Sequence, residues 1–200
     1  MKKTVILLLT LALLAACLAG CANKDEIQFG ADCLRFANEA LDVTSDMDTF
    51  AGSIAECLEA DGVTIPLKND WTYYGKCVQH HELNVQQWAL DGEDVTGLTQ
   101  EEITSRLPGI IEQYEAISGN KIDAENAVAL RAAVIRLYQA EQDMIYHVTN
   151  VAGPADSYRD RALTILDKAV QARKEILELL EPYWQKKGFP NLANKIINGG

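Results

Sequence analysis

The stretch of sequence that decides the fold is residues 26–60, which read EIQFGADCLRFANEALDVTSDMDTFAGSIAECLEA. Apolar residues recur through this stretch at alternating intervals of four and three positions, the heptad spacing that places them on one side of an α-helix. This apolar seam consists of Phe29, Cys33, Phe36, Ala40, Val43, Met47, Phe50, Ile54 and Cys57. We therefore expect one unbroken helix from about residue 26 to residue 60, with Gly62 as its stop.

The chain after residue 62 predicts a second helical rod that is broken into two pieces. Asn69 or Asp70 can cap the first piece, whose apolar face carries Trp71, Tyr74, Val78, His81, Val85 and Trp88. Residues 91–94, Asp-Gly-Glu-Asp, interrupt the pattern. The sequence Thr99-Gln100-Glu101-Glu102 then forms a capping box that starts a helix reaching about Ser118, with a bend expected at Pro108.

Two further helices follow. The first is expected over about 123–152 and ends at Gly153-Pro154, with an apolar seam at Ala127, Leu130, Val134, Leu137, Glu141, Met144, Val148 and Val151. The second is traced by Tyr158, Ala162, Ile165, Ala169, Ala172, Ile176, Leu179 and Tyr183, and it ends at Gly188 before a short amphipathic tail.

The three unbroken helices match in length at about 45 to 50 Å, since each residue of an α-helix adds about 1.5 Å. Matched rods with short connections predict an all-α fold, an up-down four-helix bundle of long helices with a segmented second helix and a short C-terminal helical tail. A five-helix arrangement is the nearest alternative. Residues 26–200 are enough for one core and too few for two comfortable domains, so we expect a single domain.

The N-terminal stretch has the layout of a secretory signal. Lys2 and Lys3 precede an apolar run that is too short to span a membrane, and the run closes with Leu18-Ala19-Gly20-Cys21. This ending resembles the lipobox of bacterial lipoproteins, in which the cysteine receives a diacylglyceryl thioether and becomes the mature N-terminus. The resemblance implies a signal peptide over 1–20, a lipidated tether over 21–25, and a place in the cell envelope.

The predicted lipidation and location leave two alternatives open. Leu14-Ala15-Ala16-Cys17 also fits the lipobox, so Cys17 is the alternative lipidation site. Without lipobox processing, the chain is an ordinary secreted protein. In a lipoprotein the anchor lies on the outer face of the cytoplasmic membrane or on the outer membrane.

The chain is strongly acidic. Its formal net charge is −11, and removal of residues 1–20 leaves 16 basic and 29 acidic side chains, a net charge of −13. Such a charge repels nucleic acid, so no nucleic-acid partner is expected. The predicted partners are the membrane, through the N-terminal lipid, and an unidentified protein, peptide or envelope component.

The cysteines after the signal suggest a disulfide. Cys57 and Cys77 are almost equidistant from a turn near residue 67, so an antiparallel hairpin places them at the same height and an oxidising compartment permits a Cys57–Cys77 bond. The alternative is a pair of buried free thiols. A weaker alternative is a zinc site of Cys57, Cys77, His80 and His81. The sequence has neither Cys-x-x-Cys-His nor Glu-x-x-His, and we expect no cofactor.

Two polar residues interrupt otherwise apolar seams. His81 lies between Val78 and Val85, and Glu141 lies between Leu137 and Met144. Counted from their nearest turns, both stand at a similar level in an up-down bundle, which predicts a hydrogen-bonded His81–Glu141 layer with Lys168 as a neighbour. The layer is either a structural feature that fixes the register of the helices or a ligand site in the bundle core.

Nothing in the sequence has the pattern of a catalytic nucleophile, a phosphate-binding glycine loop or a paired-carboxylate site. We therefore expect a non-enzymatic, lipid-anchored helical module that binds a partner. The competing hypothesis is a bundle that binds a metal, haem or small molecule through the His81 and Glu141 region.

Overall fold

The described parts of the chain are mostly helical. The computed structural model describes the backbone of residues 2–63, 71–122 and 126–198, and side chains from residue 24 onward within those ranges. These ranges contain helices and no strand, which confirms the predicted all-α class. The elements are α1 (Lys2–Ala60), α2 (Trp71–Leu90), α3 (Gln100–Ser118), α4 (Ala127–Thr149), α5 (Ala155–Leu179), the 3₁₀ helix η1 (Glu181–Gln185) and α6 (Phe189–Ile197).

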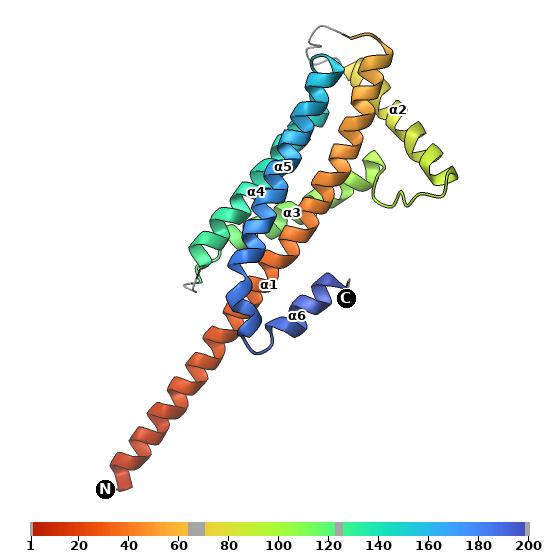
Figure 1. The fold of residues 1–200 in the computed structure, drawn as a ribbon. Helices are drawn as coiled ribbons and strands as arrows, with labels where there is room; N and C mark the ends of the chain where they lie inside the picture. Colours follow the sequence, from red (N-terminus) through yellow and green to blue (C-terminus); the bar gives the residue numbers. More distant parts are fainter. Residues whose placement is uncertain (1, 64–70, 123–125, 199–200) are drawn as a thin grey trace.

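Helix α1 is the centre of the molecule. It packs against α2, α3, α4, α5 and α6, and its entire predicted seam from Phe29 to Cys57 is buried. The unbroken helix expected over 26–60 is confirmed, and α1 continues beyond it toward the N-terminus (Figure 1). The predicted lipobox falls in this N-terminal part, where the side chains of residues 1–23 lie outside the described residues.

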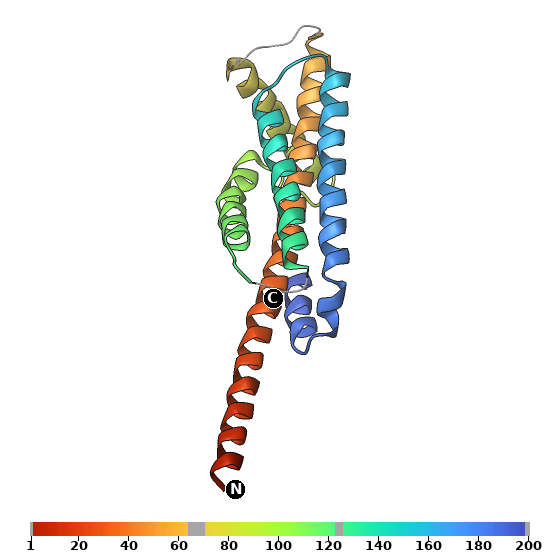
Figure 2. The same ribbon diagram turned by 90° about the vertical axis from the view of Figure 1, so that its left-hand side faces the viewer.

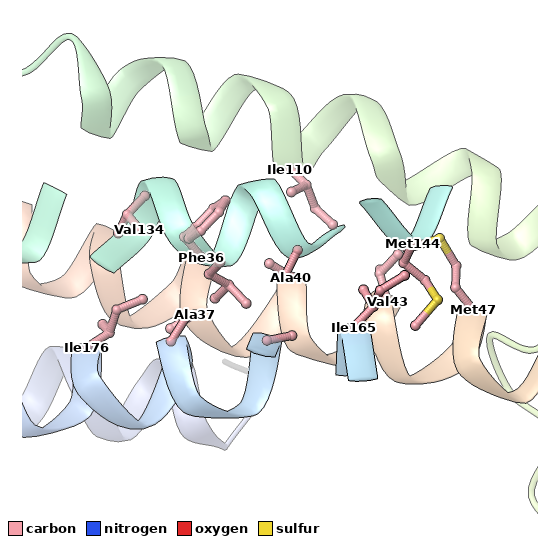
Figure 3. Close-up of a cluster of buried hydrophobic side chains, with 14 of the residues drawn as sticks. Phe36, Ala37, Ala40, Val43, Met47, Ile110, Val134, Met144, Ile165 and Ile176 are labelled. Atoms are coloured by element: carbon pink, nitrogen blue, oxygen red, sulfur yellow. The ribbon is translucent and has the colours of Figure 1, made fainter. Parts of the chain in front are cut away.

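Helices α4 and α5 pack beside α1 and against each other (Figures 1 and 2). Helix α5 runs antiparallel to α1, because Arg159 near its start bonds Asp48 while Arg173 further along bonds Asn38. Small residues let these backbones approach, and larger ones fill the layers between them, as at Ala37 and Ala40 beside Ile176 and Ile165 (Figure 3). The resulting cluster of buried apolar residues draws on every one of the helices.

Helix α3 packs against both α1 and α4 (Figure 2). The predicted capping box is present, since the backbone N–H of Glu102 donates to the Thr99 hydroxyl at 3.2 Å and the Thr99 N–H donates to the Glu102 carboxylate at 3.1 Å. Pro108 lies inside the helix. The ring of Tyr114 stacks on Tyr138 of α4, with centroids 3.8 Å apart.

Helix α2 diverges from the other helices as it descends (Figure 1). It packs mainly on the far end of α1, where the Tyr73 hydroxyl donates to the Cys57 carbonyl at 3.3 Å. The predicted caps Asn69 and Asp70 lie outside the described residues. The second rod is indeed in two pieces, and the four-helix bundle as such stays a prediction.

The C-terminal end differs from the sequence-based expectation. The last long helix ends at Leu179 instead of continuing toward Gly188, and a 3₁₀ turn containing Pro182 follows. This turn folds Tyr183 back onto α1, where Gly30 leaves room for its ring. Gly188 then adopts a φ of 103°, which favours glycine, and α6 starts after it as the predicted short tail.

Among the described residues, no helix combines the length and apolar character that crossing a membrane requires.

Candidate functional site

The predicted His81 site is a fully satisfied structural contact. His81 is completely buried, and its Nε2 donates to the Leu98 carbonyl at 2.7 Å, so that Nδ1 can accept from the Ser53 hydroxyl at 3.0 Å. Its ring packs on Phe50 with centroids 4.6 Å apart. Burial lowers the pKa of His81 and favours the neutral ring. The histidine therefore ties α2 and the loop before α3 to α1.

Glu141 lies apart from His81. It is fully buried in α4, and neither carboxylate oxygen has a hydrogen-bond partner, although the Gln142 side chain lies close to it. Burial raises the pKa of Glu141 from 4.5 to about 7, so the carboxyl holds its proton to near neutral pH. Because His81 bonds Ser53 and Leu98 instead, the predicted His81–Glu141 layer is wrong.

Lys168 is also elsewhere. It is exposed on α5, in a shallow groove of about 760 Å³ between α4 and α5. Most of the other side chains in this groove are polar or charged, among them Arg136, Asp143 and Glu175. The three residues predicted to share one polar site thus occupy three different places.

The predicted disulfide is absent. Cys57 and Cys77 come together as neighbours, but both are buried free thiols that are not at bonding distance. The Cys77 thiol makes a hydrogen bond to the Cys57 side chain, and burial raises the pKa of Cys77 far above its usual range. Since disulfide formation requires a thiolate, this environment disfavours oxidation. Cys33 is a third buried thiol.

The zinc alternative fails as well. Both ring nitrogens of His81 are taken by hydrogen bonds, and the nearest acidic partner of His80 is Glu56 at 3.5 Å. Within the described ranges, no three His, Cys, Asp or Glu side chains are grouped so that they could hold a metal ion.

A second buried histidine was not expected from the sequence. His147 of α4 stacks on Tyr158 of α5 with ring centroids 4.0 Å apart, its Nε2 donates to the Tyr158 carbonyl, and the Tyr158 hydroxyl donates to the His147 carbonyl, both at 3.0 Å. Burial lowers the pKa of His147 to about 4. These reciprocal bonds fasten α4 to α5 beside the turn that connects them, so this histidine is structural.

An apolar groove lies between α1 and α5 and is closed at one end by η1 and α6. We call it the α1/α5 groove. Its volume is about 930 Å³, and its floor and walls are mostly aliphatic. Val170, Trp184 and Ile197 are 41, 38 and 55 % exposed, a large accessible share for apolar side chains. The lining residues are Leu34, Asn38, Leu41, Asp42, Ser45, Leu166, Val170, Arg173, Leu177, Trp184, Ile196 and Ile197.

Sequence periodicity contains a signal for this groove. Besides its core seam, α5 carries a second apolar stripe at Leu163, Leu166, Val170 and Leu177, with the helical spacing of three, four and seven positions. A helix buried on one side only needs one such stripe. The second stripe indicates a second apolar surface, and the structure leaves it partly uncovered.

Polar contacts fix the shape of the groove. The Arg173 guanidinium donates to the Asn38 side chain at 2.9 Å across its floor. Toward the far end, Arg159 donates to both carboxylate oxygens of the buried Asp48, at 3.0 and 3.1 Å, and clamps α5 to α1. On the rim, the Asp42 side chain is 72 % exposed and is 3.1 Å from Arg106 of α3. The groove is therefore preformed and mostly apolar, with Asp42 and Arg173 as the charged residues of its lining.

Comparison with known proteins returns no match to any family model, curated sequence or solved structure.

Proposed function

We propose that the chain is a lipid-anchored, non-enzymatic binding module of the cell envelope that receives a basic amphipathic helix of a partner protein in the α1/α5 groove. The observation that carries this proposal is the groove itself, an apolar surface between packed helices with several exposed large side chains. Exposed apolar surfaces of this kind commonly mark protein or ligand binding sites.

The chain's own packing indicates what fits such a groove. The opposite side of α1, facing α4, is covered by the amphipathic helix α3, which inserts Ile103, Ile110 and Ile117. One end of the α1/α5 groove is closed in the same way by α6, which buries Phe189 and Ala193. We infer that a helix with apolar residues at intervals of three and four fits the part that remains open.

The framework we propose is the up-down bundle, with α1, α4 and α5 as three rods and the α2 and α3 pieces as the segmented fourth. In this arrangement α2, α3 and α4 cover α1 on the sides where they pack, and the side of α1 that lines the α1/α5 groove stays open. A partner helix would add a further rod there.

Charge selects among partner helices. The chain carries a net charge of −11, or −13 without residues 1–20. In the groove itself Asp42 is paired with Arg106, so the selection comes from the long-range field of the whole chain. A second copy of this chain or another acidic helix meets long-range repulsion, whereas a basic helix is attracted. The proposed partner helix is therefore rich in lysine and arginine outside its apolar stripe.

The anchor is a separate part of the proposal. Cys21, or Cys17 as the alternative, would carry the lipid, and the bundle begins shortly after it, since Glu26 already contacts Lys186 at 2.5 Å. Intact mass spectrometry of protein extracted from membranes tests this directly. A diacylglyceryl mass that is lost in Cys21→Ser and kept in Cys17→Ser supports Cys21, and the reverse pattern supports Cys17. The absence of a lipid mass refutes anchoring.

A synthetic peptide tests the groove. The probe is a helical peptide of about 18 residues, or five turns, with leucine on one face and lysine elsewhere, compared with a version carrying glutamate in place of lysine. We expect the lysine peptide to bind the full-length protein more tightly, and Val170→Asp to weaken that binding. Val128→Asp is the matched control, since Val128 is 75 % exposed on α4 and does not line the groove. Equal affinity for both peptides, or equal loss in both variants, would refute the site.

A further inference from the structure

The C-terminal segment has a charge opposite to that of the whole chain. Residues 182–200 contain three lysines and no aspartate or glutamate, whereas the chain as a whole has a net charge of −11. This segment forms all of α6 and all of η1 except its first residue, the exposed Glu181, and both elements pack against the beginning of the bundle part of α1 (Figures 1 and 2). The local excess of positive charge is thus gathered at one end of the molecule.

Two of the three lysines are available for an external partner. Lys186 donates to Glu26 of α1 at 2.5 Å and lies 5.2 Å from the centre of the Tyr183 ring, so it fastens η1 to α1. Lys187 and Lys195 are exposed, and no ion pair is recorded for either within the described residues. Between and beside them lie the exposed side chains of Trp184, Gln185, Asn191, Asn194, Ile197 and Asn198.

We propose that this exposed face of η1 and α6 is a membrane-contacting surface that binds the headgroups of anionic lipids. We call it the lysine face. The proposal rests on the lipid anchor proposed above, because the anchor decides which end of the molecule meets the membrane. It adds a local contact with anionic lipids to a chain whose overall negative charge is repelled by them.

Distance supports the orientation. Glu26 lies five positions after Cys21, a span of about 8 Å if this stretch is helical, as α1 is there, and at most about 18 Å if it is fully extended. Lys186, bonded to Glu26, precedes Lys187 directly. The Debye length at physiological ionic strength is about 8 Å, so charges within about that distance of the headgroups still act on them, whereas charges farther along the molecule are largely screened. The other end of α1, at Ala60, is about 50 Å away along the helix.

The side-chain chemistry fits a lipid–water interface. Lysine ammonium groups attract anionic headgroups, and tryptophan is enriched at the interface because its ring is apolar and its N–H is polar. Trp184 is held edge-on against Phe189 with centroids 5.4 Å apart, which fixes its position beside Lys187. The apolar face of α6 is turned inward, where Phe189 and Ala193 are buried, so the contact involves headgroups and does not require insertion.

The experiment compares lysine reactivity on two kinds of vesicle. Protein purified from membranes, with its mass recorded, is reconstituted into vesicles of phosphatidylcholine alone or with about 30 % phosphatidylglycerol, and treated with an amine-acylating reagent. Peptide mass spectrometry then gives the acylation rate of each lysine. We expect Lys187 and Lys195 to react about fivefold more slowly on the anionic vesicles, the factor that corresponds to about one headgroup contact per lysine. About 0.5 M salt should remove the difference.

Controls separate this surface from the anchor. Lys174 on α5 has a side chain that is 67 % exposed and lies outside the lysine face, so its rate should be the same on both vesicles. In Lys187→Gln the protection of Lys195 should fall, whereas Lys174→Gln should leave it unchanged. Equal rates for Lys187 and Lys195 on the two vesicles overturn the lysine face. If the recorded mass carries no lipid, the anchor fails, and co-sedimentation of the same protein with the two vesicles decides the lysine face: binding to anionic vesicles alone supports it, and no binding overturns it.

Discussion

Replacing Glu141 with leucine should stabilise the protein, and the gain should grow as the pH rises. Glu141 is 0 % exposed, and both of its carboxylate oxygens lack a hydrogen-bond partner. An uncompensated carboxylate is far more expensive to bury than a carboxylic acid, because the interior cannot replace its hydration. The folded protein therefore retains the proton, and the pKa of Glu141 rises from 4.5 to about 7.

The sign and size of the effect follow from that shift. Because the folded-state pKa lies above the unfolded value, the unfolded chain loses its proton first as the pH rises, and stability falls between pH 4.5 and 7. A shift of this size at 1.36 kcal/mol per pH unit corresponds to about 3 kcal/mol. In Glu141→Leu this loss disappears. We expect the variant to gain about 3 kcal/mol more over the natural sequence at pH 8 than at pH 4.5, or about 6 to 12 °C in Tm.

Urea unfolding followed by circular dichroism, at pH 4.5, 6 and 8, measures this difference. Glu112→Leu is the control, since Glu112 is exposed on α3 and its replacement removes the same charge from the surface. Glu112→Leu should change the free energy of unfolding by less than about 0.5 kcal/mol at each pH. A stability difference between Glu141→Leu and the natural sequence that does not change with pH would refute the reasoning, because it would mean that the carboxylate is hydrated or paired.

Three substitutions probe packing, bonding and capping. Gly30→Ala should lower the free energy of unfolding, measured by thermal denaturation, by about 1 to 3 kcal/mol, because the new Cβ would lie 2.5 Å from the Tyr183 ring. Tyr158→Phe removes the hydroxyl that bonds the His147 carbonyl and should lower the free energy of urea unfolding by about 1 to 3 kcal/mol. Thr99→Ser keeps the helix cap and Thr99→Ala removes it, so hydrogen exchange should show faster opening of the first turn of α3 in the alanine variant only, with about 1 kcal/mol lost.

Periodic features were predicted well because they depend on local geometry. The seam from Phe29 to Cys57 repeats over four heptads, and each member adds to the same buried surface, so α1 and its buried side followed directly. The cap at Thr99 was predicted for the same reason, since both of its partners lie within three residues. Such features require no knowledge of where other helices lie.

Contacts between helices were predicted poorly because they depend on the position of each residue along the bundle axis and on the direction in which each helix runs. Counting from the nearest turns placed His81 and Glu141 at one level. In the structure His81 is level with Ser53 of α1, while Figure 3 shows Met144, one turn beyond Glu141, near Val43 and Met47. Several residues of α1 separate the two levels, at about 1.5 Å each. The divergence of α2 and the unpredicted turn at η1 cannot be read from spacing alone.

The two proposed surfaces constrain each other. Trp184 and Ile197 lie at the end of the α1/α5 groove and also beside Lys187 and Lys195 of the lysine face. A helix seated along the open part of the groove would therefore have one end near the headgroups if the lysine face meets the membrane. Tethering both proteins to the same surface raises their effective concentration without any further contact. A membrane-anchored partner could then be captured even if the affinity of its helix for the groove is modest. Val170→Asp and Lys187→Gln should each weaken this capture independently, the first by disrupting the groove and the second by loosening the orientation of the bundle on the membrane.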